Sequence, residues 1–379
     1  MGDRRIRVIA FYLPQFHPIP ENDAWWGKGF TEWTNVAKAK PLYHGHYQPH
    51  VPADLGFYDL RLPESREAQA DLARSYGVDG FCYWHYWFGN GRRILERPFA
   101  EVLTSGRPDF PFCLGWANQT WTGIWHGAPG RILVEQSYPG PDDHERHFRA
   151  MLPAFRDQRY LRVDGRPIFV VYAPTELPDA AGFIAQWNRL ARAEGLPGFY
   201  FVAHGCDIPG AGFDAFVGNL PFTSMPIAAF AQPKRVVNFA LRKLFGTNLK
   251  QLGIDRRPEV RQYRAFLEYF ERTPLGDRQL PLLIPNWDNT PRSGKRGVVL
   301  HGSTPALFER MCEAARDKIA VVSEPEKRIV FVKAWNEWAE GNHLEPDLRD
   351  GTAYLAAMQR GLGLVAGNPP AATTEARDR

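Results

Sequence analysis

The chain has 379 residues and a hydrophobic fraction of 44%, so it can bury a large core without disulfide bonds or metal ions. Its 46 basic and 42 acidic residues nearly balance, which gives no reason to expect nucleic acid or an anionic membrane as a partner. Aromatic residues are abundant, with 12 Trp, 14 Tyr and 25 Phe, and most of the Trp residues lie in polar or Gly-rich surroundings.

Short apolar segments alternate with helix-like segments along the chain. We predict strands at residues 7–12, 80–83, 112–116, 168–172, 199–203, 215–217, 282–284 and 329–334, and helices at residues 63–76, 142–158, 180–194, 261–272 and 305–320. The strand segments are apolar on both faces, which is typical of buried parallel strands. The alternation favours an α/β fold of the (β/α)8 TIM barrel type, and an open, doubly wound sheet is the alternative. We predict one domain over residues 1–366 and a disordered tail at residues 367–379.

Two long segments exceed what the barrel repeat requires. Residues 14–54 follow the first strand and are dense in Trp, His, Pro and Asn. Residues 221–258 are rich in Lys and Arg, and residues 236–245 within them have the pattern of an amphipathic helix. This basic insertion is either a solvated helix, a lid, or a peripheral membrane contact through residues 234–257.

The N-terminal residues, the apolar runs and the cysteines of the sequence bear on where the protein acts. The first residues lead straight into a strand-like segment, and no apolar run approaches the roughly 20 residues of a membrane span. The four cysteines, Cys82, Cys113, Cys206 and Cys312, are far apart and form no CxxC pair. These features predict a cytoplasmic protein from a reducing compartment, without a transmembrane segment.

In a barrel of this type, functional groups lie where the strands end and the βα loops begin. Aromatic and hydrogen-bonding residues occur together at nearly every predicted strand end. Sugars need this combination, because their C–H faces stack on aromatic rings while their hydroxyls need donors and acceptors. We therefore predict an oligosaccharide or polysaccharide substrate, bound by Tyr12, Gln15, His17, Glu32, Trp33, Tyr83, Trp84, His85, Trp116, Asn118, Trp121, Tyr172, His204, Trp287, Asp288, Trp335, Asn336, Trp338 and His343.

Two glutamates are the strongest catalytic candidates. Glu337 and Glu340 directly follow the last predicted strand, and a helical turn would place their Cβ atoms about 5–6 Å apart on one face. Cleaving a glycosidic bond requires two carboxyl groups, one protonated and one ionised. Trp335 and Trp338 beside them could desolvate one carboxyl group and raise its pKa. The alternative is a solvated helix face, as in most ExxE pairs.

Other polar residues have two interpretations each. Glu345 is either a third acid or a structural carboxylate, Glu32 either binds sugar or caps a turn, and Asp288 either binds sugar or forms a turn. The histidines at positions 44, 46 and 50 have an HxHxxxH spacing, but no carboxylate motif accompanies them and loop histidines are usually solvated. We predict no metal ion and no cofactor.

Three separated motifs resemble those of a known family. They are FYLPQFHP at residues 11–18, GKGFTEWTNV at residues 27–36 and WNEWAEG at residues 335–341. Together they resemble the WbsX proteins, which occur with polysaccharide (O-antigen type) biosynthesis genes and are often labelled glycosyltransferases. The resemblance extends over nearly the whole chain.

The third motif also resembles the endo-α-mannosidases of glycoside hydrolase family 99, which are (β/α)8 barrels without a metal in the catalytic step. The resemblance implies that Glu337 acts as a base on the sugar 2-hydroxyl and gives a 1,2-anhydro intermediate. It implies that Glu340 is the general acid and then the base for water. This route suits α-manno and α-rhamno sugars, whose 2-hydroxyl is trans to the leaving group.

Three functions are compatible with these patterns. The main prediction is a retaining glycoside hydrolase that acts on a bacterial glycan. A glycosyltransferase is the alternative, although the sequence has no Asp-x-Asp motif and no GxGxxG turn after a strand. A non-catalytic glycan-binding protein would keep the Trp residues but would not need both Glu337 and Glu340.

Overall fold

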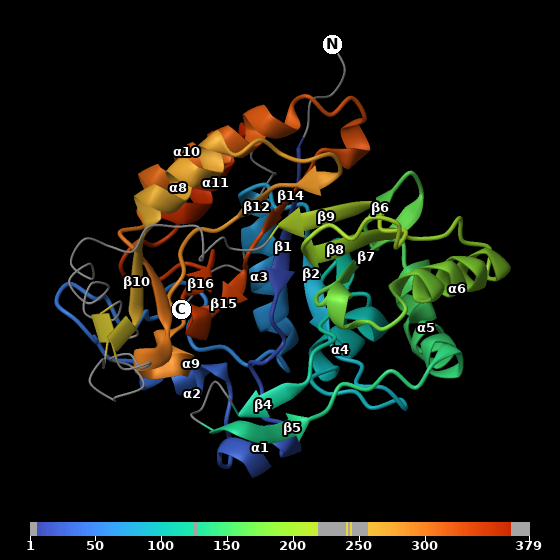
Figure 1. Cartoon of the computed structure of the whole chain (residues 1–379), viewed down its shortest axis with the longest axis horizontal. Helices are drawn as coiled ribbons and strands as arrows, with labels where there is room; N and C mark the ends of the chain where they lie inside the picture. The colour runs from blue at the N-terminus through green and yellow to red at the C-terminus, as the bar shows by residue number, and fades with distance from the viewer. Residues whose placement is uncertain (1–5, 124–127, 219–239, 242, 245–256, 365–379) are drawn as a thin grey trace, which may run out of the picture.

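The computed structural model describes residues 6–123, 128–218, 240–241, 243–244 and 257–364, and a parallel barrel lies at its centre (Figure 1). Around the barrel the strands are β1 (Arg7–Tyr12), β2 (Gly80–His85), β3 (Phe112–Trp116), β7 (Arg166–Val171), β8 (Tyr200–Gly205), β9 (Ala215–Gly218), β11 (Gln279–Leu280) with β12 (Leu282–Leu283), and β14 (Ile329–Val332). All neighbours are parallel. Every residue of β2, β3 and β14 is buried, because these strands are apolar on both faces.

A broken strand closes the barrel. β11 pairs with β9 and β12 pairs with β14, while Pro281 lies between β11 and β12. The carbonyl oxygen of Pro281 accepts a hydrogen bond from Phe331 N at 2.9 Å, so the break still contributes to the ladder although proline has no N–H. Since β14 also pairs with β1, the described strands form a nearly closed ring of eight positions, interrupted between β11 and β12. The (β/α)8 barrel is confirmed, and the doubly wound alternative is wrong because such a sheet has two edges.

Helices surround the barrel, and five of them lie close to the predicted positions, whereas those at residues 97–105 and 353–362 were not predicted. The helices are α3 (Pro63–Ser75), α4 (Arg97–Ser105), α5 (Pro141–Arg156), α6 (Ala180–Ala193), α8 (Tyr263–Arg272), α10 (Pro305–Ile319) and α11 (Ala353–Leu362). Proline at the first turn begins α3, α5 and α10. The helix predicted from residue 261 begins later, because β10 (Glu259–Gln262) pairs with β13 (Val298–His301). No described helix is both long and apolar enough to cross a membrane.

Short elements occupy the loops after the barrel strands. They are α1 (Pro20–Trp26), α2 (Glu32–Ala37), the hairpin of β4 (Trp121–Gly123) and β5 (Ala128–Val134), α9 (Thr290–Ser293), β15 (Asn336–Glu337), the 3-10 turn η7 (Trp338–Glu340) and β16 (Asn342–His343). The predicted insertion at residues 14–54 therefore contains α1 and α2. Figure 1 shows α1, α2, α9 and the hairpin together at one end of the molecule, with α8, α10 and α11 at the other.

Two predicted segments lie mostly or wholly outside the described residues. The basic insertion at residues 221–258, with its helix at 236–245, is one, and the tail at residues 367–379 is the other. The solvated helix, the lid and the membrane contact through residues 234–257 stay open as interpretations of the insertion.

Gly115 in β3 leaves the space that the Trp84 ring occupies. A Cβ atom at position 115 would lie 2.9 Å from Trp84 Cζ3 and 3.2 Å from Cys82 Sγ. We predict that Gly115→Ala lowers the free energy of unfolding by about 1–3 kcal/mol, because a packed ring must shift. In the control Gly276→Ala the new Cβ meets nothing closer than Gln279 Oε1 at 3.5 Å, and we expect a change below about 0.5 kcal/mol. Denaturant unfolding measures both, and equal values would contradict the prediction.

Candidate active site

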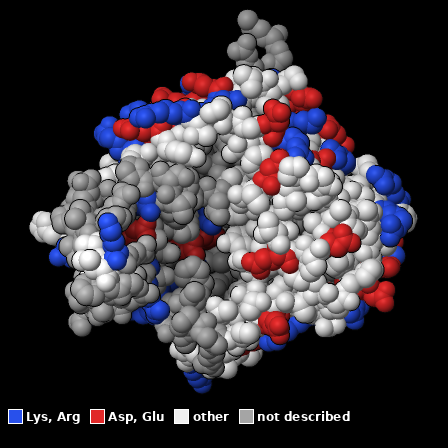
Figure 2. Space-filling view, in the orientation of Figure 1, with Lys and Arg blue, Asp and Glu red and all other residues white. Residues whose placement is uncertain are grey.

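A cavity of about 200 Å³ opens at the C-terminal ends of the barrel strands. Its walls come from β2, from the loops after β1, β3, β7 and β14, and from α1, α2, α9 and the β4–β5 hairpin. Figure 2 shows that the face seen in Figure 1 is hollowed near its middle, with acidic side chains inside the hollow. The lining contains five charged residues, Glu32, Arg292, Lys333, Glu337 and Glu340, and five large aromatic residues, Trp26, Trp84, Tyr86, Trp121 and Tyr172. This position is the usual one for the active site of such a barrel.

Glu337 lies in β15 and is buried. Trp84 Nε1 donates a hydrogen bond to Glu337 Oε1 at 2.8 Å and orients the carboxyl group. Burial raises the pKa of Glu337, Lys333 lowers it and Glu340 raises it again, so that it reaches about 7. A carboxyl group with this pKa can take up or release a proton near neutral pH, as a general acid or base must.

Glu340 shares one guanidinium group with Glu32. Arg292 Nη1 donates to Glu340 Oε1 at 2.6 Å, and Arg292 Nε donates to Glu32 Oε1 at 3.0 Å. Burial raises the pKa of Glu32, while Arg292 acts to lower it. The planar arginine fork suits such a bridge between two carboxylates. Glu32 therefore lies in the cavity wall, where it fixes the arginine that holds Glu340.

Lys333 brings a second cation to the cavity. The side chain follows β14 and is buried, with Nζ 5.2 Å from the ring centroid of Trp287 and 5.9 Å from that of Tyr172. Burial acts to lower the pKa of Lys333, but Glu337, Tyr172 and Glu340 together raise it. The described lining thus combines three carboxyl groups with two cations.

Rigid aromatic rings form the remaining wall. Trp84 stacks on Phe11, with centroids 4.6 Å apart and an interplanar angle of 2°. Tyr86 meets Trp121 edge to face, with centroids 5.1 Å apart. Tyr172 meets Trp84 at an interplanar angle of 88°. Flat apolar faces beside carboxylates form a surface that suits the C–H faces and hydroxyls of a sugar.

The loop that carries Glu337 and Glu340 is held by hydrogen bonds to the end of β1. Glu337 and Glu340 are joined by the 3-10 turn η7 rather than by an α-helical turn, and β15 pairs with β16. Asn336 Oδ1 accepts from Leu13 N at 2.7 Å, and Asn336 Nδ2 donates to Leu13 O at 3.0 Å. These two bonds attach the loop to the end of β1.

Glu345 is a buried structural carboxylate. Its Oε2 accepts from Trp338 Nε1 at 2.6 Å and from Tyr58 OH at 2.8 Å, and its Oε1 accepts from Gln69 Nε2 at 2.6 Å. Burial raises the pKa of Glu345 to about 7. Because the side chain lies outside the cavity lining, the structural interpretation of Glu345 fits better than that of a third acid.

The structure brings part of the predicted site together. Seven predicted residues line the cavity: Gln15, Glu32, Trp84, Trp121, Tyr172, Glu337 and Glu340. The others lie outside its lining: Tyr12, His17, Trp33, Tyr83, His85, Trp116, Asn118, His204, Trp287, Asp288, Trp335, Asn336, Trp338 and His343. All of the latter are buried, and several support the wall by hydrogen bonds within the protein. Trp33 Nε1, for example, donates to Tyr58 O at 2.8 Å, and Trp116 Nε1 donates to Trp87 O at 3.0 Å.

Asp288 holds loops together rather than lining the cavity. Its Oδ2 bonds His46 Nε2 at 2.6 Å and Gln48 Nε2 at 2.7 Å. Its Oδ1 accepts from Thr290 N at 2.9 Å and from Thr290 Oγ1 at 2.6 Å. With four hydrogen bonds from three residues of the protein, Asp288 fits the turn-forming interpretation better than that of a sugar ligand.

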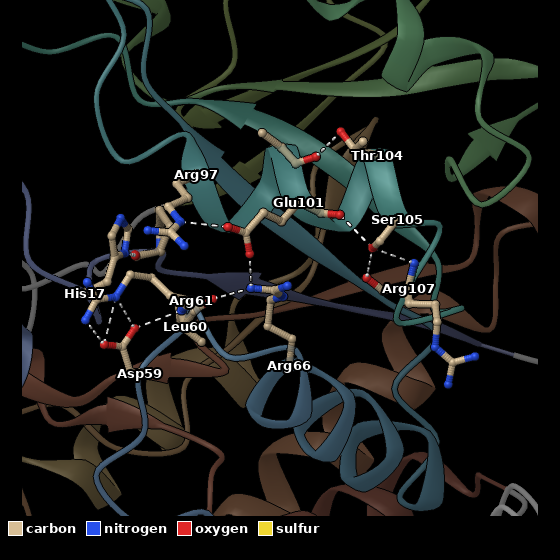
Figure 3. A network of polar contacts seen from close by, with 12 residues as sticks. His17, Asp59, Leu60, Arg61, Arg66, Arg97, Glu101, Thr104, Ser105 and Arg107 are labelled. Carbon is tan, nitrogen blue, oxygen red and sulfur yellow. Dashed lines mark hydrogen bonds and ion pairs between the residues drawn. The ribbon is translucent and has the colours of Figure 1, made fainter.

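His17 belongs to a polar network elsewhere in the fold. Figure 3 shows its ring beside the ion pair of Arg61 and Asp59, which are 2.6 Å apart, and near Arg97 and Glu101 of α4. Burial lowers the pKa of His17. The position gives this histidine no place in the cavity lining.

Eleven lining residues were not predicted, among them Trp26, Asn35, Tyr86, Arg292 and Lys333. Lys333 had a detectable signal, because it interrupts the apolar run at residues 329–334 immediately before the glutamate motif. Tyr86 follows β2 in an aromatic run. Arg292 had no signal, because its role depends on Glu32 and Glu340, which are distant in sequence.

Comparison with known proteins gives the family. The model of the family described as Glycosyltransferase WbsX matches residues 8–358. The protein WxcX from two strains of Xanthomonas campestris pv. campestris is 40% identical over 362 residues, which cover 94% of this chain and 49% of WxcX. The chain therefore spans about half the length of the curated relatives it matches.

Solved structures share the fold. One described as a glycoside hydrolase-like protein has a TM-score of 0.57 and 15% identity, and the match covers 97% of this chain and 96% of that chain. The GH99 endo-α-mannosidase from Bacteroides thetaiotaomicron, in complex with BIS-TRIS-propane, has a TM-score of 0.53 and 14% identity, over 95% and 97% of the two chains. At these identities the likeness shows the barrel alone, whereas the family match and the WxcX identity establish that this chain belongs to the WbsX family.

Proposed function

We propose that this protein is a retaining glycoside hydrolase that acts on α-manno- or α-rhamno-configured bacterial polysaccharide. The observation that carries the proposal is the meeting of Glu337 and Glu340 in one cavity with aromatic walls. A pair of carboxyl groups beside stacking surfaces is what glycosidic cleavage requires.

The proposed reaction proceeds in two steps. Glu337 takes the proton of the sugar 2-hydroxyl, O2 attacks C1, and the glycosidic bond breaks while Glu340 gives its proton to the leaving oxygen. Glu340, now ionised, takes a proton from water, whose oxygen opens the 1,2-anhydro ring at C1, and O2 recovers its proton from Glu337. Two inversions at C1 give net retention. Arg292 stabilises Glu340 as the carboxylate that forms in the first step.

The family description favours a second candidate, a glycosyltransferase of polysaccharide (O-antigen) biosynthesis. In that reaction a sugar hydroxyl replaces water as the acceptor, and an activated sugar is the donor. A nucleotide sugar needs cations for its phosphates, but the two cations that the described residues bring to the cavity already face carboxylates. Hydrolysis therefore fits the site better.

Removing either acid should abolish turnover without unfolding the protein. We predict that Glu337→Gln and Glu340→Gln each lower kcat by about 10²–10⁴-fold on α-mannosyl or α-rhamnosyl oligosaccharides. Both glutamines keep an acceptor for Trp84 or Arg292, so the circular dichroism spectrum should stay unchanged. Glu313→Gln, on the exposed face of α10, is the control and should keep full activity. Normal turnover by Glu340→Gln would remove its role as acid, and a change in KM alone for Glu337→Gln would remove the 2-hydroxyl mechanism.

The pH profile tests whether Glu337 belongs to the acid–base pair. Because the reaction needs one ionised and one protonated carboxyl group, kcat/KM should be bell-shaped, and burial of Glu337 raises its pKa so that one limb of the bell lies near pH 7. Glu345 has a pKa raised to about 7 as well, so Glu345→Gln is the control and should keep the same limb. A profile with no limb near pH 7, or a limb that disappears in Glu345→Gln, would contradict this role of Glu337.

A further inference from the structure

Three side chains outside the cavity lining bring potential metal ligands together. His50 lies in the long loop after α2, His343 lies in β16 and Asp347 follows it. His50 Nδ1 is 3.0 Å from Asp347 Oδ2 and 3.3 Å from His343 Nε2, and the three ligand atoms lie within 4.8 Å of one another. Any two nitrogen or oxygen ligand atoms of a tetrahedral zinc site are about 3.3 Å apart, since each lies about 2.0–2.1 Å from the metal.

The partners of His343 fix which of its nitrogens can bind a metal. His343 Nδ1 lies 2.9 Å from the carbonyl oxygen of Glu345, which can only accept, so Nδ1 carries the hydrogen. Nε2 of His343 therefore presents a lone pair toward His50. A histidine that is oriented through its other nitrogen is typical of metal ligands.

Asp347 is oriented in the same way. Its Oδ1 accepts from the backbone N–H groups of Arg349 at 3.0 Å and Asp350 at 2.7 Å. Its Oδ2 is directed at His50 Nδ1, 3.0 Å away.

A second histidine–aspartate pair shows what an ordinary hydrogen bond looks like in this fold. His46 also bonds an aspartate, Asp288, but the same oxygen accepts from the amide of Gln48, which is a donor and cannot bind a metal. At His50, by contrast, the one ring nitrogen faces two acceptors. A single hydrogen on Nδ1 would have to be shared between Asp347 and His343, whereas one cation would satisfy all three atoms.

We propose that His50, His343 and Asp347 form a binding site for a divalent cation of the zinc class. Two imidazoles and one carboxylate match the preference of zinc for nitrogen and oxygen ligands. Of the three ligands, His50 also lines a neighbouring cavity of about 230 Å³, so a fourth ligand to the cation could come from solvent on that side. The sequence pattern of three histidines did not reveal this site, because only His50 of that pattern takes part.

The site is placed to stabilise the catalytic loop rather than to take part in the reaction. Its ligands His50 and His343 are 293 residues apart in sequence, so a bound metal would tie two distant loops together. The His343 ring stacks on Trp338, with centroids 3.8 Å apart and an interplanar angle of 10°. Trp338 lies between Glu337 and Glu340, and none of the three ligands lines the cavity that holds these glutamates.

Zinc binding can be measured directly on the untagged full chain after removal of metal with a chelator. Competition with a chromophoric zinc indicator should give one equivalent bound, with a Kd of about 1 µM or below. His50→Ala and Asp347→Asn should weaken binding at least about tenfold. The control His44→Ala removes an exposed histidine from the same loop and should bind as the unchanged chain does.

Cobalt gives a readout that does not depend on how well the variants fold. Co²⁺ added to the metal-free chain should give the strong visible bands of a tetrahedral site at one equivalent, and excess Zn²⁺ should remove them. Zinc should also raise the Tm of the unchanged chain and of His44→Ala but not that of His50→Ala. The proposal is overturned if the unchanged chain binds no zinc above the level of His50→Ala, or if Co²⁺ gives only the weak spectrum of the hydrated ion.

Discussion

The buried ion pairs at the mouth of the barrel are the constraint on which the rest of the site depends. Arg292 bridges Glu32 and Glu340, and Lys333 faces Glu337. Leaving one member of such a buried set without its partner typically costs about 3–5 kcal/mol, so the charges must be assembled as a group. The barrel makes this possible, because α2, α9 and the loop after β14 all meet at the same end of the parallel strands.

Glu337 and Glu340 are held by different kinds of group, and this difference matters for their chemistry. Glu340 is held directly by a guanidinium group, whereas Glu337 receives a hydrogen bond from the uncharged indole of Trp84. Burial therefore raises the pKa of Glu337 to about 7 in spite of its cationic neighbours. Environments that give two nearby carboxyl groups different affinities for a proton are characteristic of acid–base pairs. Asn336, Glu345 and Trp338 hold the loop so that this difference is maintained.

Much of the fold could be predicted from the sequence, because buried parallel strands leave a clear pattern of short apolar runs between helices. The predicted strand at residues 282–284 covers β12 but misses β11, which lies on the other side of Pro281. The glutamate pair could also be predicted from its position after the last strand. The aromatic residues were harder, since an aromatic residue at a strand end points either into the cavity, as Trp84 does, or into the core, as Tyr12 does. Arg292 could not be found, because only tertiary contacts define its role.

The measurement that tests the central claim most directly is mass spectrometry of the products formed from α-mannosyl and α-rhamnosyl oligosaccharides in ¹⁸O-water, with and without nucleotide sugars. The account predicts cleavage with one ¹⁸O atom in the new reducing end and no need for a nucleotide sugar. Extension of the oligosaccharide only when a nucleotide sugar is present, with no ¹⁸O incorporated, would contradict it. The family description would then be correct as it stands, and Glu337 and Glu340 would need other roles.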